Sequence, residues 1–167
     1  MNQEIKVRVN MKTNNMYDFL FHHTYSNASG IVGVLLSLVA LVYLLLNLGN
    51  LSNAKIILLI LGALLFTVIN PGMLYVKAAQ QVKLSPMFKD TLCYILNQEG
   101  ITVEQAEQQL VIKWEEVQKV IETKQNIIIY VSKVSAFILP KDAFEEYGKA
   151  VQFISENVDK KKCKWKK

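Results

Sequence analysis

The chain has 167 residues, 51% of them hydrophobic, and a formal net charge of +5 at pH 7. This charge is local: residues 159–167 contain six lysines and one aspartate, and the rest of the chain has equal numbers of basic and acidic groups. The balanced remainder excludes the extended basic groove of a nucleic-acid-binding domain, so we expect no nucleic-acid partner.

Residues 1–13 predict a β-strand. Apolar and polar side chains alternate along residues 5–12, which is the period of a half-buried strand. A lone strand is unstable in water, so we expect it to join a sheet formed by the C-terminal part of the chain. The aromatic and polar residues 14–29 then predict a short helical lead-in at the membrane interface.

Two uncharged apolar stretches, residues 30–48 and 56–76, follow. A helix of about 20 residues spans the roughly 30 Å hydrocarbon core of a bilayer. The short segment 49–55 only reverses the chain, so residues 30–76 predict a two-helix transmembrane hairpin, retained rather than cleaved as a signal peptide. Asn70-Pro71-Gly72 predicts a bend near the end of the second span.

The distribution of cations sets the expected orientation. The hairpin loop holds only Lys55, whereas five cations flank the spans: Arg8, Lys12, Lys77, Lys83 and Lys89. Because lysine and arginine favour the cytoplasmic side, we expect both termini in the cytoplasm and the protein in the plasma membrane as a multi-pass protein.

After a connector at residues 77–86, the sequence predicts a small cytoplasmic domain within residues 77–158. Short β-rich runs occur at residues 91–96, 101–104, 110–114, 117–123, 127–131 and 136–139, and Gly100 is expected in a turn at positive φ. Residues 141–158 repeat apolar side chains every three or four positions, which predicts an amphipathic helix. Antiparallel strands closed by one C-terminal helix indicate a small α+β fold of the pleckstrin-homology (PH) type.

Three sequence runs carry a resemblance to a known family. They are Trp114-Glu115-Glu116-Val117, residues 127–130, and the run from Ala136 through Pro140-Lys141 to Phe144. With the layout of strand, two spans and small domain, they resemble the YcxB-like family of bacterial membrane proteins. The resemblance implies a bacterial PH-like domain and brings no catalytic residues.

The residues of this motif are expected to be structural. Trp114 is predicted to anchor the core where a strand ends, and Pro140 to end the last strand. Phe144, three residues after Lys141, is predicted to be the first apolar residue of the helical stripe. Buried aromatic side chains usually serve packing.

No constellation of catalytic residues is recognisable. The sequence has no glycine-rich phosphate loop, no metal-protease motif and no nucleophile elbow. His22 and His23 are adjacent and lack metal-ligand spacing, and the distant Cys93 and Cys163 are expected to be reduced thiols. We therefore expect a protein that is not an enzyme and needs no metal or cofactor.

The basic tail, residues 159–167, leaves two interpretations open. Its side chains suit contact with anionic lipid headgroups, and they also suit a disordered, solubilising tail. The candidate lipid-contacting residues are Lys160, Lys161, Lys162, Lys164, Trp165, Lys166 and Lys167.

The leading functional hypothesis is a membrane-anchored PH-like protein that binds a protein, peptide or lipid at the cytoplasmic face, in an envelope-stress or immunity role. The alternative is an accessory subunit of a transporter complex. In that case small residues, which allow close helix contact, would pack against partner spans: Gly33, Ser37, Gly62 and Ala63. A homo-oligomer also fits the sequence.

Overall fold

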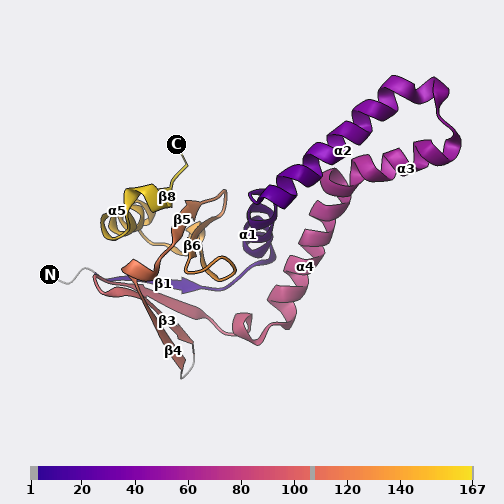
Figure 1. The fold of residues 1–167 in the computed structure, drawn as a ribbon. Coiled ribbons are helices and arrows are strands. Elements are labelled where there is room, and N and C mark those ends of the chain that lie inside the picture. Colours follow the sequence, from indigo (N-terminus) through magenta and orange to yellow (C-terminus); the bar gives the residue numbers. More distant parts are fainter. Residues whose placement is uncertain (1–3, 106–107, 167) are drawn as a thin grey trace. The chain divides into compact units, whose positions relative to one another are not determined.

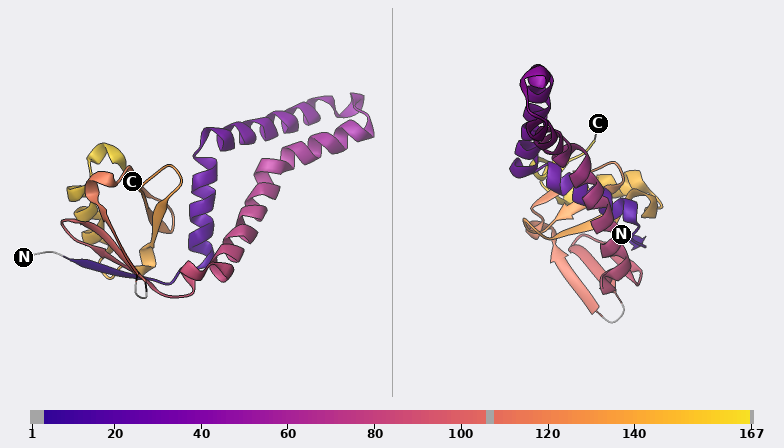
Figure 2. Two further views of the ribbon diagram at one scale, coloured as in Figure 1. Left: turned by 60° about the horizontal axis from the view of Figure 1, so that its bottom comes forward. Right: turned by 90° about the vertical axis from the view of Figure 1, so that its right-hand side faces the viewer.

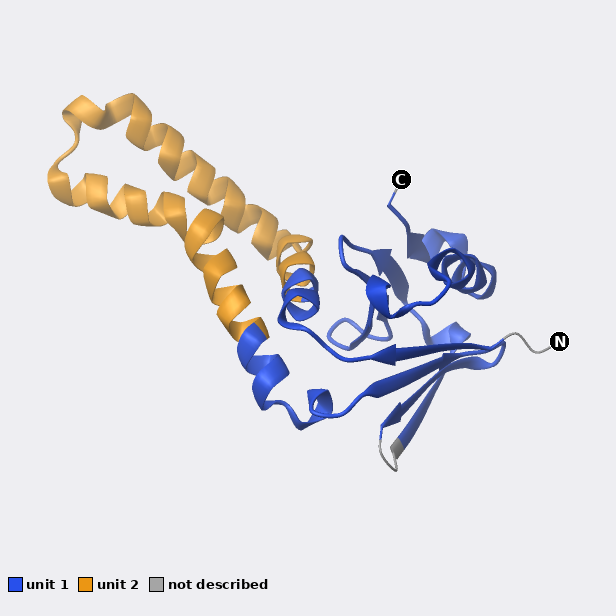
Figure 3. Ribbon diagram, turned by 180° about the vertical axis from the view of Figure 1, so that it is seen from behind, with its two compact units in different colours: residues 1–19, 79–167 blue, residues 20–78 orange. Residues whose placement is uncertain are grey.

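The structure is a computed structural model that describes residues 4–105 and 108–166. The chain divides into two compact units (Figure 3). The first contains Met1–Phe19 and Ala79–Lys167, and the second contains Leu20–Ala78. The first unit is therefore assembled from one chain segment that precedes the second unit in the sequence and one that follows it.

Two four-stranded sheets build the first unit (Figures 1 and 2). One has the order β1-β2-β3-β4, with strands Ile5–Val9, Leu92–Leu96, Gly100–Gln105 and Gln108–Lys113. The other has the order β7-β6-β5-β8, with strands Ala136–Pro140, Asn126–Tyr130, Lys119–Glu122 and Cys163–Lys164. All pairs are antiparallel except β5–β8, which is parallel.

Strand β1 is an integral part of the first sheet. It pairs with β2 from Ile5↔Leu96 to Val9↔Leu92. Val7 and Val9 are fully buried, whereas Arg8 on the opposite face is exposed. The prediction that the N-terminal strand joins the sheet of the C-terminal block is confirmed.

Gly100 has the positive φ that the sequence predicted, and it is also required for a second reason. It follows the turn as the first residue of β3, and a Cβ atom there would lie 2.1 Å from the Ile112 carbonyl oxygen. The preceding turn is held by the Asn97 side chain, which accepts hydrogen bonds from the backbone N–H groups of Glu99 and Gly100 at 2.9 and 3.0 Å. Close approach of β3 to β4 therefore demands glycine.

Helix α5 (Tyr147–Asn157) is shorter than predicted. Residues 141–143 instead form the 3-10 turn η5 (Lys141–Ala143), and Phe144 follows it outside the helix. The Lys141 backbone N–H donates to the Gln125 carbonyl oxygen at 2.9 Å, which ties this segment to the β5–β6 turn. The prediction that Phe144 opens the helical stripe was therefore wrong; the buried stripe begins with Ala150, Phe153 and Ile154.

The second unit consists mainly of helices. They are the part of α1 (Thr13–Tyr25) from Leu20 onward, α2 (Ala28–Asn47), η1 (Leu48–Asn50), α3 (Asn53–Leu64), the π-helical η2 (Leu65–Ile69) and the part of α4 (Asn70–Leu84) up to Ala78. Two continuous helical segments, Ala28–Asn50 and Asn53–Leu84, are long and apolar enough to cross a membrane.

Two details of this region differ from the sequence prediction. The expected connector at 77–86 is helical as far as Leu84, and Pro86 begins the short η3 (Pro86–Phe88) instead. The irregularity expected at residues 70–72 lies one turn earlier, in η2. Because Pro71 has no N–H and its ring crowds the preceding turn, the hydrogen-bond ladder changes before the proline is reached.

Candidate functional site

The polar side chains of the first unit gather in two networks, neither of which has the make-up of a metal centre. Within residues 4–105 and 108–166, no three His, Cys, Asp or Glu side chains lie where they could hold one metal ion. Cys93 and Cys163 are both free thiols.

Glu122 on β5 is the centre of the first network. One carboxylate oxygen accepts a hydrogen bond from the Lys141 ammonium group, and the other accepts one from the Lys166 backbone N–H at 2.9 Å. The Lys141 ammonium also lies 5.3 Å from the centroid of the Tyr147 ring, within range of a cation–π interaction. Glu122 thereby joins β5, η5, α5 and the lysine-rich segment.

Burial and hydrogen bonding determine the protonation states of Glu122 and Tyr147 in this network. Burial raises the pKa of the Glu122 carboxyl, but the hydrogen bond from Lys141 and the bonds from its other neighbours outweigh burial and bring the pKa below its ordinary value. Burial, and after it the adjacent Glu122, raise the pKa of the Tyr147 phenol. Glu122 is therefore an anion and Tyr147 a neutral phenol at neutral pH.

The lysine-rich segment is ordered. Residues 160–162 form the turn η6 (Lys160–Lys162), and Cys163 and Lys164 then pair with Val120 and Ile121 of β5. The disordered-tail interpretation is therefore wrong for the described part of this segment, and the predicted boundary between a domain at 77–158 and a tail at 159–167 cuts through the sheet. Lys167 lies outside the described residues.

The lysines of this segment are not equivalent. The Lys162 ammonium donates to the Val117 carbonyl oxygen at 2.7 Å and the side chain is half-buried, so it serves the fold. Trp165 is also half-buried. The side chains of Lys160, Lys161, Lys164 and Lys166 are exposed.

Lys119 on β5 was missed by the sequence interpretation. Burial, and after it the positive charge of Lys164, lower the pKa of its amine. Lys119 is 45 positions from Lys164 in the sequence, and only the parallel pairing of β8 with β5 brings them together. No local sequence pattern predicts that Lys164 lies near Lys119.

Three of the motif residues occupy structural positions. Trp114 is 7% exposed, its indole N–H donates to the Asn97 carbonyl oxygen at 2.7 Å, and its ring packs edge-on against Phe153 at 6.2 Å. Pro140 pairs with Asn126 at the end of β7. Phe144 contacts the Tyr147 ring edge-on at 5.9 Å.

The second polar network ties the first half of α1 to the β5–β6 turn. One Asp18 carboxylate oxygen accepts hydrogen bonds from the Thr123 hydroxyl and, at 2.8 Å, from the Asn126 side chain. The Asn126 side chain also exchanges hydrogen bonds with Asn15, at 3.2 Å to its side chain and 3.0 Å to its carbonyl oxygen. Asn15, Thr123 and Asn126 are buried.

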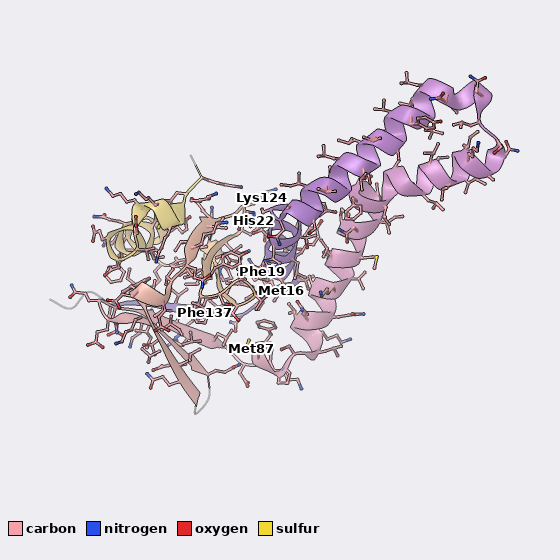
Figure 4. The ribbon with its side chains drawn as sticks, viewed as in Figure 1. Met16, Phe19, His22, Met87, Lys124 and Phe137 are labelled. Carbon is pink, nitrogen blue, oxygen red and sulfur yellow. The ribbon has the colours of Figure 1, made fainter. Side chains whose placement is uncertain are left out.

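Phe19 extends the same contact with an apolar side chain. It packs on the cluster of Ile121, Ile128 and Tyr130, with its ring 6.4 Å from that of Tyr130 (labelled in Figure 4). Residues 13–19 thus belong to the strand-rich unit, whereas the sequence suggested only an interfacial lead-in. The polar residues of α1 were the available signal, because a helix that only approaches a membrane does not need Asn15 and Asp18 on the side that carries Phe19.

In the second unit, small residues serve contacts inside the hairpin. A Cβ atom on Gly33 would lie 2.4 Å from the Phe66 ring, so glycine makes room for that ring. The Ser37 hydroxyl donates to the Gly62 carbonyl oxygen at 2.8 Å and accepts from the Phe66 N–H at 3.3 Å. Gly33, Ser37 and Gly62 are thus engaged within this chain, which removes the specific reason to assign them to a partner span.

Comparisons with known proteins agree on one family. The model of the family described as YcxB-like protein matches residues 96–154. A Bacillus subtilis (strain 168) protein named "Uncharacterized protein YcxB" is 33% identical over 113 residues, which are 66% of this chain and 61% of that protein. No solved structure gives a significant match.

Proposed function

Because the chain belongs to the YcxB-like family, we propose that it is a non-enzymatic bacterial membrane protein whose hairpin holds a PH-like binding unit at the cytoplasmic face. The observation that carries this proposal is the pairing of β1 with β2, two strands separated in the sequence by both apolar helices. Because β1 precedes the hairpin in the sequence and β2 follows it, the strand-rich unit is connected to the hairpin by two segments of the chain.

The exposed surface of the hairpin supports the membrane part of the proposal. Large apolar side chains cover α2 and α3, with Leu46 78% exposed and Leu58 70% exposed. Contiguous apolar surface of this kind is costly in water and is the expected surface in lipid. The spans therefore fit a bilayer better than an aqueous environment.

The order of elements supports a PH-like unit. Strands β1 to β4 form one antiparallel meander, β5 to β7 form a second, and helix α5 follows. The hairpin is inserted between β1 and β2, so the sequence of the unit is interrupted while its sheet is continuous.

A binding role fits the chemistry better than catalysis. The two polar networks, at Glu122 and at Asn126, direct their carboxylate and amide groups at one another and at the backbone. Polar groups that bond to one another in this way fix a fold. The partner classes we propose are a protein, a peptide or a lipid.

Site-specific photocrosslinking in the native membrane tests this function. A photoreactive residue at Val111, which is 54% exposed on the edge strand β4, reports on the strand-rich unit, and one at Leu46 reports on the hairpin. A discrete protein or lipid adduct at Val111 or at other exposed positions of the strand-rich unit supports a binding unit. Protein adducts confined to the hairpin would instead favour an accessory subunit of a transporter.

A further inference from the structure

The first unit carries a fixed group of basic side chains around β8. We call it the basic ridge: Lys119, Lys160, Lys161, Lys164 and Lys166, with Trp165 among them. In Figure 1, β8 in yellow lies beside β5 in orange. Two hydrogen bonds hold this segment in place: the Lys162 ammonium group donates to the Val117 carbonyl oxygen, and the Lys166 backbone N–H donates to the Glu122 carboxylate.

Among the described residues, the nearby carboxylates of Glu122 and Asp159 form no ion pair with these lysines. Glu122 gives one oxygen to the Lys141 ammonium and the other to a backbone N–H. Asp159 accepts the backbone N–H of Lys161 at 2.9 Å, as the cap of η6. Among the ion pairs of the described residues, none contains a lysine of the basic ridge.

The fold brings like charges together here. Pairing of β8 with β5 brings Lys164 near Lys119, where burial, and after it the charge of Lys164, lower the pKa of the Lys119 amine. Two ammonium groups held near one another by a sheet repel, and a bound anion between or over them relieves the repulsion. The basic ridge is therefore complementary to a phosphate-bearing surface.

We propose that the basic ridge binds the phosphate groups of anionic phospholipids in the membrane that carries the hairpin. This inference rests on the proposed function, because the hairpin keeps the unit next to a bilayer. Half-buried Trp165 lies between Lys164 and Lys166 in the sequence, and tryptophan with lysine is the usual combination at the headgroup layer. Tethering makes lipid the anion of highest local concentration.

The test uses the full chain in nanodiscs of phosphatidylcholine, with or without about 30% phosphatidylglycerol, an anionic lipid. Hydrogen exchange of residues 159–166 is expected to slow several-fold in the anionic discs. The effect should disappear in about 1 M salt, where the Debye length is about 3 Å. Equal exchange in the two kinds of disc would overturn the proposal.

A pair of matched variants makes the test specific. Lys119→Gln combined with Lys164→Gln should abolish the lipid-dependent protection, whereas Lys113→Gln combined with Lys133→Gln, at exposed positions outside the basic ridge, should retain it. Trp165→Phe should remove the part of the tryptophan quenching that depends on brominated phosphatidylglycerol, since Trp114 is buried. Protection lost equally in both double variants would show an effect of net charge alone and overturn the site.

Two further arms separate other sources of the anion. Inorganic phosphate or poly-glutamate is added to discs of neutral lipid. Protection by inorganic phosphate without protection by anionic discs would show a small-anion site, and the same result with poly-glutamate would assign the ridge to an acidic protein; either overturns the lipid assignment. Failure of the protein to stay membrane-bound in alkaline carbonate would refute the proposed function separately.

Discussion

Trp114 shows how one motif residue combines burial with a hydrogen bond. Its ring packs on Phe153 of α5, and its N–H satisfies the Asn97 carbonyl beside the turn that leads into β3. One side chain therefore links the segment between β4 and β5, where Trp114 lies, to the β2–β3 turn and to helix α5. The sequence predicted a buried anchor, but it gave no indication that Asn97 is the partner, because that contact spans 17 positions.

Trp114→Ala is expected to destabilise the strand-rich unit by about 3–5 kcal/mol, because it leaves a cavity and an unpaired carbonyl. Trp114→Phe should cost less, since it keeps a ring and loses only the hydrogen bond. Urea-dependent proteolysis in detergent measures both variants, with Trp165→Phe as the control. Resistance equal to that of the parent in Trp114→Ala would show that the site is not part of the core.

At the scale of elements, β1 and η2 show two ways in which contacts between distant segments decide structure. Strand β1 is recognisable from the alternation of its side chains, and its place in a sheet of the C-terminal block was expected because that block was the only candidate for pairing. The sequence does not predict the π-helical segment η2 in the same way. Its residue Phe66 forms hydrogen bonds with Ser37 and Tyr25, which lie on other helices, and these contacts cannot be inferred from the local sequence.

The face of β1 gives a matched pair of variants. Val7 is fully buried and Arg8 is exposed, although they are neighbours. Val7→Asp buries an unpaired charge and should loosen the whole strand-rich unit, whereas Arg8→Asp should have little effect. Hydrogen exchange of β2 and β3 measures the difference, and equal protection in the two variants would contradict the role of β1.

Tyr25 compensates for the irregular backbone of η2. The Asn70 N–H donates to the Leu65 carbonyl, five residues back, and Pro71 has no N–H, so the Phe66 carbonyl lacks its usual donor. The Tyr25 hydroxyl donates to that carbonyl at 2.7 Å and accepts from the Asn70 side chain at 3.1 Å. A tyrosine outside the helix thus completes its hydrogen bonding.

Tyr25→Phe should therefore destabilise the hairpin by roughly 0.6–2 kcal/mol, the range for a hydrogen bond between helices in a membrane. Tyr43→Phe is the control, because Tyr43 is 51% exposed on α2. Thermal unfolding in detergent, followed by helical circular dichroism, measures both. A loss of the same size in the two variants would show that the Tyr25 hydroxyl does not contribute.

At the scale of the whole molecule, the sequence predicted the order of elements well and their ends poorly. Hydrophobic spans, strand alternation and the helical stripe depend on neighbours along the chain, and each was recognisable. Three features depend instead on contacts between segments that are distant in the sequence, and they were not predicted. They are the 3-10 turn at Lys141 in place of the helix start, the ordered structure of residues 159–166, and the proximity of Lys119 to Lys164. The candidate lipid-contact set changed for that reason: Lys162 left it and Lys119 entered it, while Lys167 lies outside the described residues.

The expected topology has a direct test. The structure shortens the turn of the hairpin to Leu51 and Ser52, between η1 and α3, and Ser52 is exposed. Ser52→Cys should react with an impermeant thiol reagent in intact cells, because the cation distribution places this turn outside. Labelling of the native Cys163 in intact cells, with an unreactive position 52, would reverse the orientation.

The pairing of Val9 with Leu92 also has a consequence in time. These residues are 83 positions apart, so at about 5–20 residues per second β1 waits about 4–17 s on the ribosome before β2 is made. Both apolar helices are synthesised during this interval. The sheet of the strand-rich unit is therefore completed only after the hairpin has been made, and a chain that stalls or inserts wrongly leaves β1 without its partner.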